Sequence, residues 1–258
     1  MECTYSQGKD YQPNQNPIFL DTESGIAELI NHIVASPPCN CLLFVDIAGE
    51  RLSRDGTISL LQILLFPSNT IYMIDVHKLG FTAFSVNGYA GWTLKQVLEA
   101  PQIVKVFFDV RNDSAALHAC YNIKLDGVRD LQLMELAACS SKKYVHGLRH
   151  CIEQSCRITG EQKNGWVKNH VQGLNLFVPA WGGMFDIFNA RPLNHEILSF
   201  CAQQVYYLPL LWQEYNFVLS SEWQDCASYS ARQRVIASQD ANFKGIGKHM
   251  AFGPYGWW

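Results

Sequence analysis

Residues 44–63 read FVDIAGERLSRDGTISLLQI, two apolar runs on either side of a polar segment. The polar segment, GERLSRDGT, carries Gly near both ends and separates strand-like runs over 41–47 and 58–66. Two such runs joined by a Gly-containing turn predict a pair of antiparallel strands. A further apolar run over 71–76 follows the turn Pro67-Ser68-Asn69, and a Pro-Ser-Asn sequence is typical of a turn. The sequence therefore predicts a meander of three antiparallel strands.

The segments on either side of this meander predict helices and further strands. Apolar residues spaced three and four apart over 26–34 predict a helix that ends before Pro37-Pro38. The elements expected downstream are a strand over 104–108, a helix over 113–121, a strand over 127–131, and helices beyond, most clearly over 193–217. A meander followed by alternating strands and helices predicts an α/β fold with a mixed sheet flanked by helices.

The domain organisation follows from the same patterns. Residues 1–17 are polar and rich in Pro, Asn and Gln, so we expect a flexible N-terminal arm. No linker divides the rest, so we expect one domain over 18–225. Residues 226–258 then form a C-terminal extension packed on the domain, and its basic, Gly and aromatic residues end in Trp257 and Trp258. These two rings could stack on a base, but packing on the domain is the favoured interpretation.

Composition restricts the function classes. The chain has 258 residues, a formal net charge of −3 and a pI near 6.2, which argues against binding nucleic acid through overall charge. A local basic groove is compatible with these values. The nine cysteines are odd in number and several lie in apolar runs, which predicts free thiols in a reducing, intracellular compartment, cytoplasmic or nuclear. No signal peptide precedes them, and no stretch reaches the roughly 20 apolar residues of a membrane span.

Three motifs in order resemble the ribonuclease D-like, or DEDDy, 3′–5′ exonucleases, and the eukaryotic branch with Egalitarian-like proteins in particular. They are residues 44–63, KVFFDVRNDSAALH at 105–118 and FCAQQVYYLPLLW at 200–212. The resemblance spans about 40–215 and implies the ribonuclease H-like fold of these enzymes. It also implies a site in which converging carboxylates hold two divalent metal ions that stabilise the attacking and leaving oxygens.

The sequence departs from this family at the positions that would bind the metal ions and orient the attacking water. Asp46 and Asp113 match two of the four metal-binding carboxylates. Ala48 stands where the family has Glu, Gln204 where it has the last Asp, and Phe200 where it has the Tyr that helps orient the attacking water. No catalytic set is intact, so we expect Asp46 and Asp113 to hold a metal ion weakly or not at all. We expect no cofactor, with Mg²⁺ or Mn²⁺ only if residual activity survives.

Two nearby carboxylates were weighed as replacements for the missing ligands. Glu50 lies two residues beyond Ala48 and would share its face only if the strand continued, but Gly49 and the turn are expected to end the strand there. Asp109 is expected to have a structural role, either capping the following helix or pairing with Arg111.

The resemblance and the substitutions leave three hypotheses for function. The leading one is an inactive exonuclease-like protein that binds RNA, partner proteins or both, within RNA silencing or processing. The first alternative is a weakly active metal-dependent 3′–5′ exonuclease on RNA or single-stranded DNA. The second is a scaffold that binds only proteins or forms a homodimer. The candidate nucleic-acid-binding residues are Lys142, Lys143, Arg149, Lys244 and Lys248.

Cysteines and histidines suggest a second kind of site. The residues considered as zinc ligands are Cys39, Cys41, His146, His150, Cys151 and Cys156. Cys39 and Cys41 are closer in sequence than a usual pair of zinc ligands, and no matching second pair is present. The favoured interpretation of the region 142–150 is therefore a partly exposed basic helix.

Overall fold

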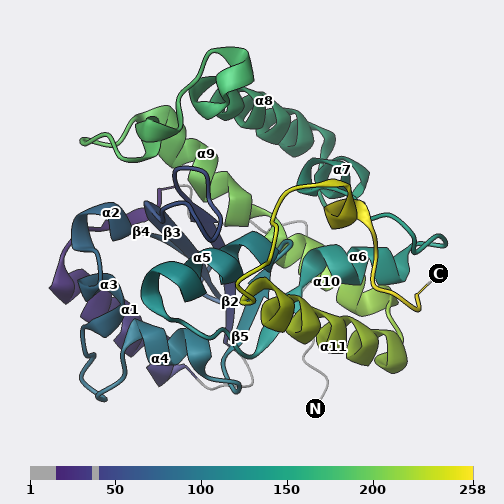
Figure 1. The fold of residues 1–258 in the computed structure, drawn as a ribbon, viewed down its shortest axis with the longest axis horizontal. Helices are drawn as coiled ribbons and strands as arrows, with labels where there is room; N and C mark the ends of the chain where they lie inside the picture. The colour runs from purple at the N-terminus through teal and green to yellow at the C-terminus, as the bar shows by residue number, and fades with distance from the viewer. Residues whose placement is uncertain (1–15, 37–40, 258) are drawn as a thin grey trace.

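A computed structural model describes residues 16–36 and 41–257 of the chain. A six-stranded mixed sheet, in the order β1-β4-β3-β2-β5-β6, forms its centre (Figure 1). The strands are β1 (Ile18–Leu20), β2 (Leu42–Ala48), β3 (Leu60–Phe66), β4 (Thr70–Asp75), β5 (Val104–Phe107) and β6 (Val128–Asp130). The mixed sheet confirms the predicted fold class, and β2, β3 and β4 form the predicted antiparallel meander.

The register of the meander places the polar residues of the first motif. Asp46 on β2 lies opposite Gln62 on β3, and Ala48 lies opposite Leu60. All seven residues of β3 are buried, because helices cover the sheet on both sides of this strand. Beyond β2 the sheet continues in parallel with β5 and then β6, whose connections run through helices.

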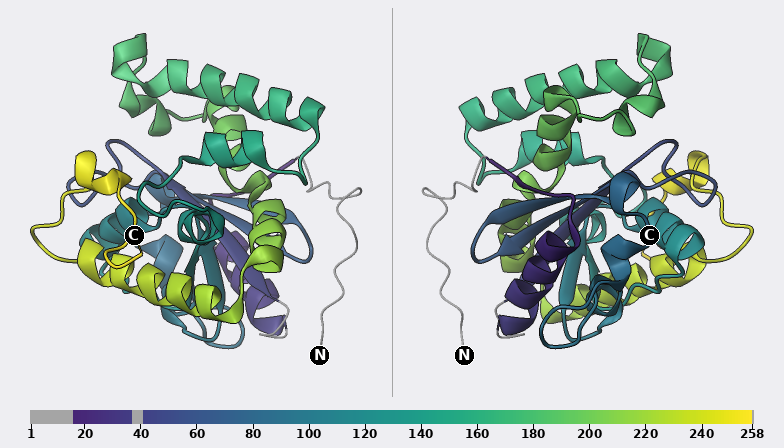
Figure 2. Two further views of the ribbon diagram at one scale, coloured as in Figure 1. Left: turned by 90° about the vertical axis from the view of Figure 1, so that its right-hand side faces the viewer. Right: turned by 90° about the vertical axis from the view of Figure 1, so that its left-hand side faces the viewer.

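Helices surround the sheet (Figures 1 and 2). They are α1 (Glu23–Ala35), α2 (Val76–Leu79), α3 (Thr82–Ser85), α4 (Leu94–Glu99), α5 (Arg111–Tyr121), α6 (Leu131–Ala138), α7 (Leu148–Gln154), α8 (Gly160–Phe177), α9 (His195–Tyr206), α10 (Leu208–Val218) and α11 (Ser221–Ser238), with short 3₁₀ turns η1 (Pro179–Trp181), η2 (Phe185–Phe188) and η3 (Lys248–Ala251). Helix α9 packs against β2, β3 and β4, and α8 packs on α9. No helix among the described residues is long and apolar enough to span a membrane.

The structure adds detail to one helical prediction and corrects another. The run over 193–217 is two helices, α9 and α10, that separate at Tyr207; Pro209 lies in the first turn of α10, where its missing N–H costs no hydrogen bond. The basic helix expected over 142–150 begins only at Leu148. The residues before it form a loop because Lys143 and Val145 hydrogen-bond through their backbones to the C-terminal segment.

The C-terminal residues pack against the domain. Helix α11 contacts α5, α6 and β6, and it runs without a break through the predicted boundary between residues 225 and 226. Further on, Phe252 forms an antiparallel bridge with Tyr144, and the Trp257 ring packs edge-on against Trp223 with 5.2 Å between ring centroids. Trp257 is thus packed, whereas Trp258 and nearly all of the predicted arm lie outside the described residues.

Candidate active site

Asp46 and Ala48 occupy the end of β2 that faces α9. Successive side chains of a strand point to opposite faces, so these two residues share a face, and Ala48 is buried. Cys201 of α9 is fully buried. Desolvation raises the pKa of its thiol well above the ordinary value, and the negative charge of Asp46 raises it further. Asp46, the first carboxylate of the predicted site, therefore has the Cys201 thiol and the Ala48 methyl group as neighbours.

Asp113 comes to the same place from the first turn of α5, where it is buried. Desolvation raises its pKa well above the ordinary value, and the negative charge of Asp46 raises it further, as do those of Asp109 and Asp130. Desolvation also raises the pKa of Asp46 to about 7. The structure thus brings together the two carboxylates that the sequence predicted, and each is stabilised in its neutral form.

The two neighbouring aspartates are held by arginines, unlike Asp46 and Asp113. Asp109 receives both hydrogen bonds of the Arg111 fork at 2.5 and 2.6 Å, which confirms the predicted pairing. Asp130 binds Arg234 of α11 at 2.7 Å. Asp130 also accepts hydrogen bonds from the backbone N–H groups of Asp109 and Val110, just before α5. The capping role that was one of the two expectations for Asp109 thus belongs to Asp130.

Phe200 and Gln204 on α9 make contacts that suit packing. The Phe200 ring is buried against α8, with its centroid 5.5 Å from the His170 ring and 5.2 Å from the Phe177 ring. A Cβ at Gly173 would lie 2.2 Å from the Phe200 ring, so glycine is required there for this ring to fit. The Gln204 side-chain amide donates to the Phe200 carbonyl at 3.2 Å, within its own helix.

These residues do not fit a two-metal centre. Magnesium takes oxygen ligands in a near-octahedral arrangement and is usually held by carboxylates. Ala48 offers no ligand atom, and Gln204 can offer only a neutral amide oxygen, which adds no negative charge to the site. Glu50 lies in the turn beyond the last residue of β2, so the alternation of the strand does not carry it onto the face of Asp46.

Gln62 is a polar residue of this region that the sequence analysis did not single out as functional. It is fully buried directly opposite Asp46, and neither side-chain amide atom has a hydrogen-bond partner in the described structure. Buried polar groups are almost always paired. A glutamine inside the otherwise apolar run ISLLQILLF was the signal that could have marked it. Cys201, by contrast, resembles a core residue in sequence.

The predicted nucleic-acid-binding residues fall into two groups. Lys142 is half-buried; its amino group donates to the Cys139 carbonyl at 2.5 Å and lies 4.6 Å from the centre of the Trp223 ring. Arg149 on α7 is exposed but paired with Glu153 at 2.9 Å. Both side chains are thus engaged within the domain.

The other three lysines are exposed on two segments that pair with each other. The Gly253 N–H donates to the Lys143 carbonyl at 2.8 Å. Lys244 and Lys248 lie earlier in the same C-terminal segment as Gly253. Two exposed aromatic side chains, Tyr144 and Tyr255, lie on the same segments. We call this set the C-terminal basic face, and its members are Lys143, Tyr144, Lys244, Lys248 and Tyr255.

The fold and the motifs agree with comparisons with known proteins. A family model described as 3′–5′ exonuclease matches residues 17–219. Trypanosoma brucei RNase D superposes with a TM-score of 0.70 at 20% identity, over 91% of this chain and 77% of that one. The catalytic core of RRP6 from the same organism gives 0.62 at 16% identity, over 90% and 56% of the two chains. Escherichia coli RNase D gives 0.58 at 18%, over 87% and 51%.

At these identities the structural likeness shows the fold, which is the ribonuclease H-like fold that the motifs predicted. No curated protein sequence matches the chain. The chain spans about half of E. coli RNase D, and a larger share of the T. brucei enzyme. Because the family model covers most of the sequence, the identification rests on that match and on the sheet around Asp46 and Asp113. The chain belongs to the 3′–5′ exonuclease family.

Proposed function

We propose that this member of the exonuclease family binds RNA without hydrolysing it. The observation that carries the proposal is the composition of the site: Ala48 and Gln204 occupy two of the four carboxylate positions, so only Asp46 and Asp113 remain. Two carboxylates supply less negative charge than a pair of divalent ions needs.

The chemistry of phosphodiester hydrolysis makes this loss severe. Two metal ions about 4 Å apart are needed to stabilise both the attacking and the leaving oxygen. The loss of a single preorganised donor in an enzyme site typically lowers the rate about 10²- to 10³-fold. Phe200 lacks the hydroxyl group that the resemblance assigns to water orientation, and its ring is packed against α8. Three such losses in one site remove the reaction.

Support for RNA as the ligand comes from the C-terminal basic face. Its lysines can contact phosphates, and exposed Tyr144 and Tyr255 offer rings on which bases can stack. The Lys143 amino group lies 5.4 Å from the centre of the Tyr144 ring, so a positive charge and an aromatic ring are close together. A structural neighbour, T. brucei RNase D, has been crystallised in a complex with RNA.

The absence of catalysis is tested with single-stranded RNA labelled at its 5′ end, in Mg²⁺ and in Mn²⁺. We expect no shortening from the 3′ end. The matched positive control is a rebuilt variant that carries Ala48→Glu, Phe200→Tyr and Gln204→Asp, together with the same variant carrying Asp113→Asn to show that any regained activity uses the site. Shortening by the natural sequence that Asp46→Asn abolishes would overturn the proposal.

Binding is tested by measuring RNA affinity across a salt series. For single strands, log K falls with log salt with a slope of about −0.7 for each phosphate contact. The double substitution Lys143→Ala and Lys248→Ala should therefore flatten the slope by about 1.4, if each lysine makes one contact. Lys124→Ala, an exposed lysine between α5 and β6, is the control and should leave the slope unchanged. RNA affinity that is absent, or insensitive to salt, would favour the protein-binding scaffold instead.

A further inference from the structure

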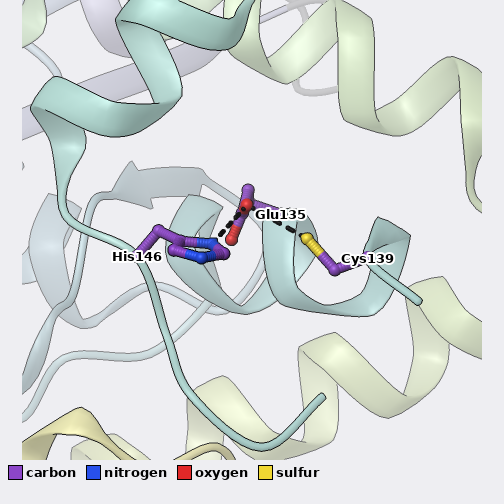
Figure 3. Close-up of side chains that lie close together, drawn as sticks. All are labelled: Glu135, Cys139 and His146. Carbon is purple, nitrogen blue, oxygen red and sulfur yellow. Dashed lines mark hydrogen bonds and ion pairs between the residues drawn. The ribbon is translucent and has the colours of Figure 1, made fainter. Parts of the chain in front are cut away.

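Outside the exonuclease site, three potential metal ligands converge at the ends of the loop that carries Lys143 and Tyr144. Glu135 lies on α6, Cys139 follows the end of that helix, and His146 comes from the loop before α7. One ligand atom from each lies within 4.8 Å of the others. Figure 3 shows the imidazole of His146 and the thiol of Cys139 approaching the Glu135 carboxylate from opposite sides. We propose that Glu135, Cys139 and His146 form a zinc site.

Two of the three separations between the donors are close to those around a tetrahedral zinc ion, and the third, between the histidine nitrogen and Cys139 Sγ, is within 4.8 Å. Glu135 Oε1 lies 2.9 Å from His146 Nδ1 and 3.1 Å from Cys139 Sγ. Zinc bonds of about 2.0–2.3 Å at tetrahedral angles place neighbouring donor atoms about 3.3–3.6 Å apart. To hold the ion, the two contacts of Glu135 would open by a few tenths of an ångström, and the imidazole and the thiol would turn toward each other.

Glu135 supplies a second, independent observation. Its side chain is more than nine-tenths buried, and its Oε2 atom has no hydrogen-bond partner in the described structure. A buried carboxylate oxygen without a partner is unfavourable, and a cation bound by both carboxylate oxygens, Oε1 and Oε2, would satisfy it. The His146 side chain is 40% exposed, so solvent reaches the cluster and a water molecule can complete the coordination.

The donor set selects zinc over magnesium or calcium. A thiolate and an imidazole are poor ligands for the hard cations, whereas zinc readily combines sulfur, nitrogen and oxygen. On binding, the Cys139 thiol releases its proton to solvent and the imidazole stays neutral. One thiolate and one carboxylate then balance the two positive charges of the ion, so the partly buried site carries no net charge.

The surroundings hold the ligands in place. The Gln132 side-chain amide donates to the His146 carbonyl at 3.0 Å, and the His150 ring stacks on the His146 ring with 4.2 Å between centroids. Cys151, which the sequence had suggested as a ligand, is buried close by but is hydrogen-bonded to Tyr215. It is therefore not part of the proposed set.

The position of the site gives it a structural consequence. The loop from Cys139 to His146 carries Lys143 and Tyr144 and pairs with the C-terminal segment, since the Val145 N–H donates to the Ala251 carbonyl at 3.0 Å. Zinc would hold this loop, and through it the C-terminal basic face. This consequence rests on the proposed RNA binding, whereas the site itself does not.

The test uses the full chain, reduced and stripped of metal with a chelator, and titrated with Co²⁺ as a spectroscopic probe. We expect a thiolate-to-cobalt charge-transfer band that saturates at one ion per chain and is bleached by Zn²⁺. Cys139→Ala should abolish the band, and His146→Ala should weaken cobalt binding at least tenfold, as a lost ligand requires. The control is Cys156→Ala, an exposed cysteine nearby, which should keep the band.

Thermal unfolding separates loss of the site from loss of the fold. His146 is partly exposed, so His146→Ala should unfold cooperatively in chelator at nearly the temperature of the natural sequence, and Zn²⁺ should stabilise only the latter. The proposal is overturned if no cobalt band appears, or if Cys156→Ala removes it and Cys139→Ala does not. Because the band is read without RNA, failure of RNA binding leaves this result intact.

Discussion

Replacing Asp46 by Asn should stabilise the protein, and increasingly so as the pH rises. Asp46 titrates at about 7 in the folded chain, against about 3.9 for an unfolded aspartate. Between these values the folded state binds more protons than the unfolded state. The free energy of unfolding of the natural sequence therefore falls as pH rises through this window. Asn stays neutral at every pH and should not show this loss.

The size of the effect follows from the two pKa values. Relative to a residue that is neutral at every pH, the raised pKa of Asp46 costs the folded state on the order of 1–2 kcal/mol at pH 5 and about 4 kcal/mol at pH 8. The natural sequence should therefore lose about 2–3 kcal/mol relative to Asp46→Asn between these two pH values. For a chain of this length, with an unfolding entropy of about 2.1 cal/mol/K per residue, that corresponds to about 5 °C in Tm.

The assay is thermal unfolding followed by circular dichroism, in chelator, at several pH values. The control is Asp55→Asn, an exposed aspartate of the turn between β2 and β3, which should leave the pH profile unchanged. Parallel profiles for the natural sequence and Asp46→Asn would show that Asp46 is well solvated. In that case the description of the site as two neutral carboxyl groups would be wrong.

Three further substitutions test the packing and the binding surface. Gly173→Ala should destabilise the chain by about 1–3 kcal/mol in urea unfolding, because the added Cβ meets the Phe200 ring. In the same measurement Gly165→Ala, which adds a Cβ in open space on the same helix, should stabilise the chain by about 0.5–1 kcal/mol. Arg191→Ala should cost about 3–5 kcal/mol in the same measurement, because it leaves the buried Asp75 charge without its partner. Tyr255→Ala, at an almost fully exposed position, should weaken RNA binding and leave unfolding unchanged.

The sequence predicted those parts of the fold that depend on local patterns. The meander was evident because the apolar runs and Gly-containing turns lie next to each other in the chain. Strand β1 was not predicted, since it has three residues, and Ile18 and Phe19 are exposed; its pairing with β4 is a contact between distant segments. The loop before Leu148 was missed for the same reason, because it is held by the C-terminal segment.

The candidate site divides in the same way. Motif spacing identified Asp46 and Asp113, but their raised pKa values depend on burial and on charges that four separate elements bring together. The proposed zinc ligands show that spacing along the sequence does not identify every ligand of a site. Cysteines and histidines adjacent in sequence suggested a site, whereas the ligand that completes the set, Glu135, lies within an apolar helix and reaches the others only in the folded chain.

The dependence of stability on the ionisation of Asp46 and Asp113 also distinguishes a weak one-metal site at these residues from the absence of metal binding there. A divalent ion binds the ionised carboxylates, so any stabilisation by Mn²⁺ through Asp46 and Asp113 must grow with pH and disappear in Asp46→Asn. At tenfold excess over its Kd, such an ion would add about 1.4 kcal/mol to the free energy of unfolding. Zinc at Glu135 would stabilise the Asp46→Asn variant as well, because the two sites share no residue. A stabilisation by Mn²⁺ that needs Asp46 would therefore indicate a weak metal site and favour the weakly active enzyme. Stabilisation by Zn²⁺ alone would argue against that enzyme, and the salt series then decides between RNA binding and the protein-binding scaffold.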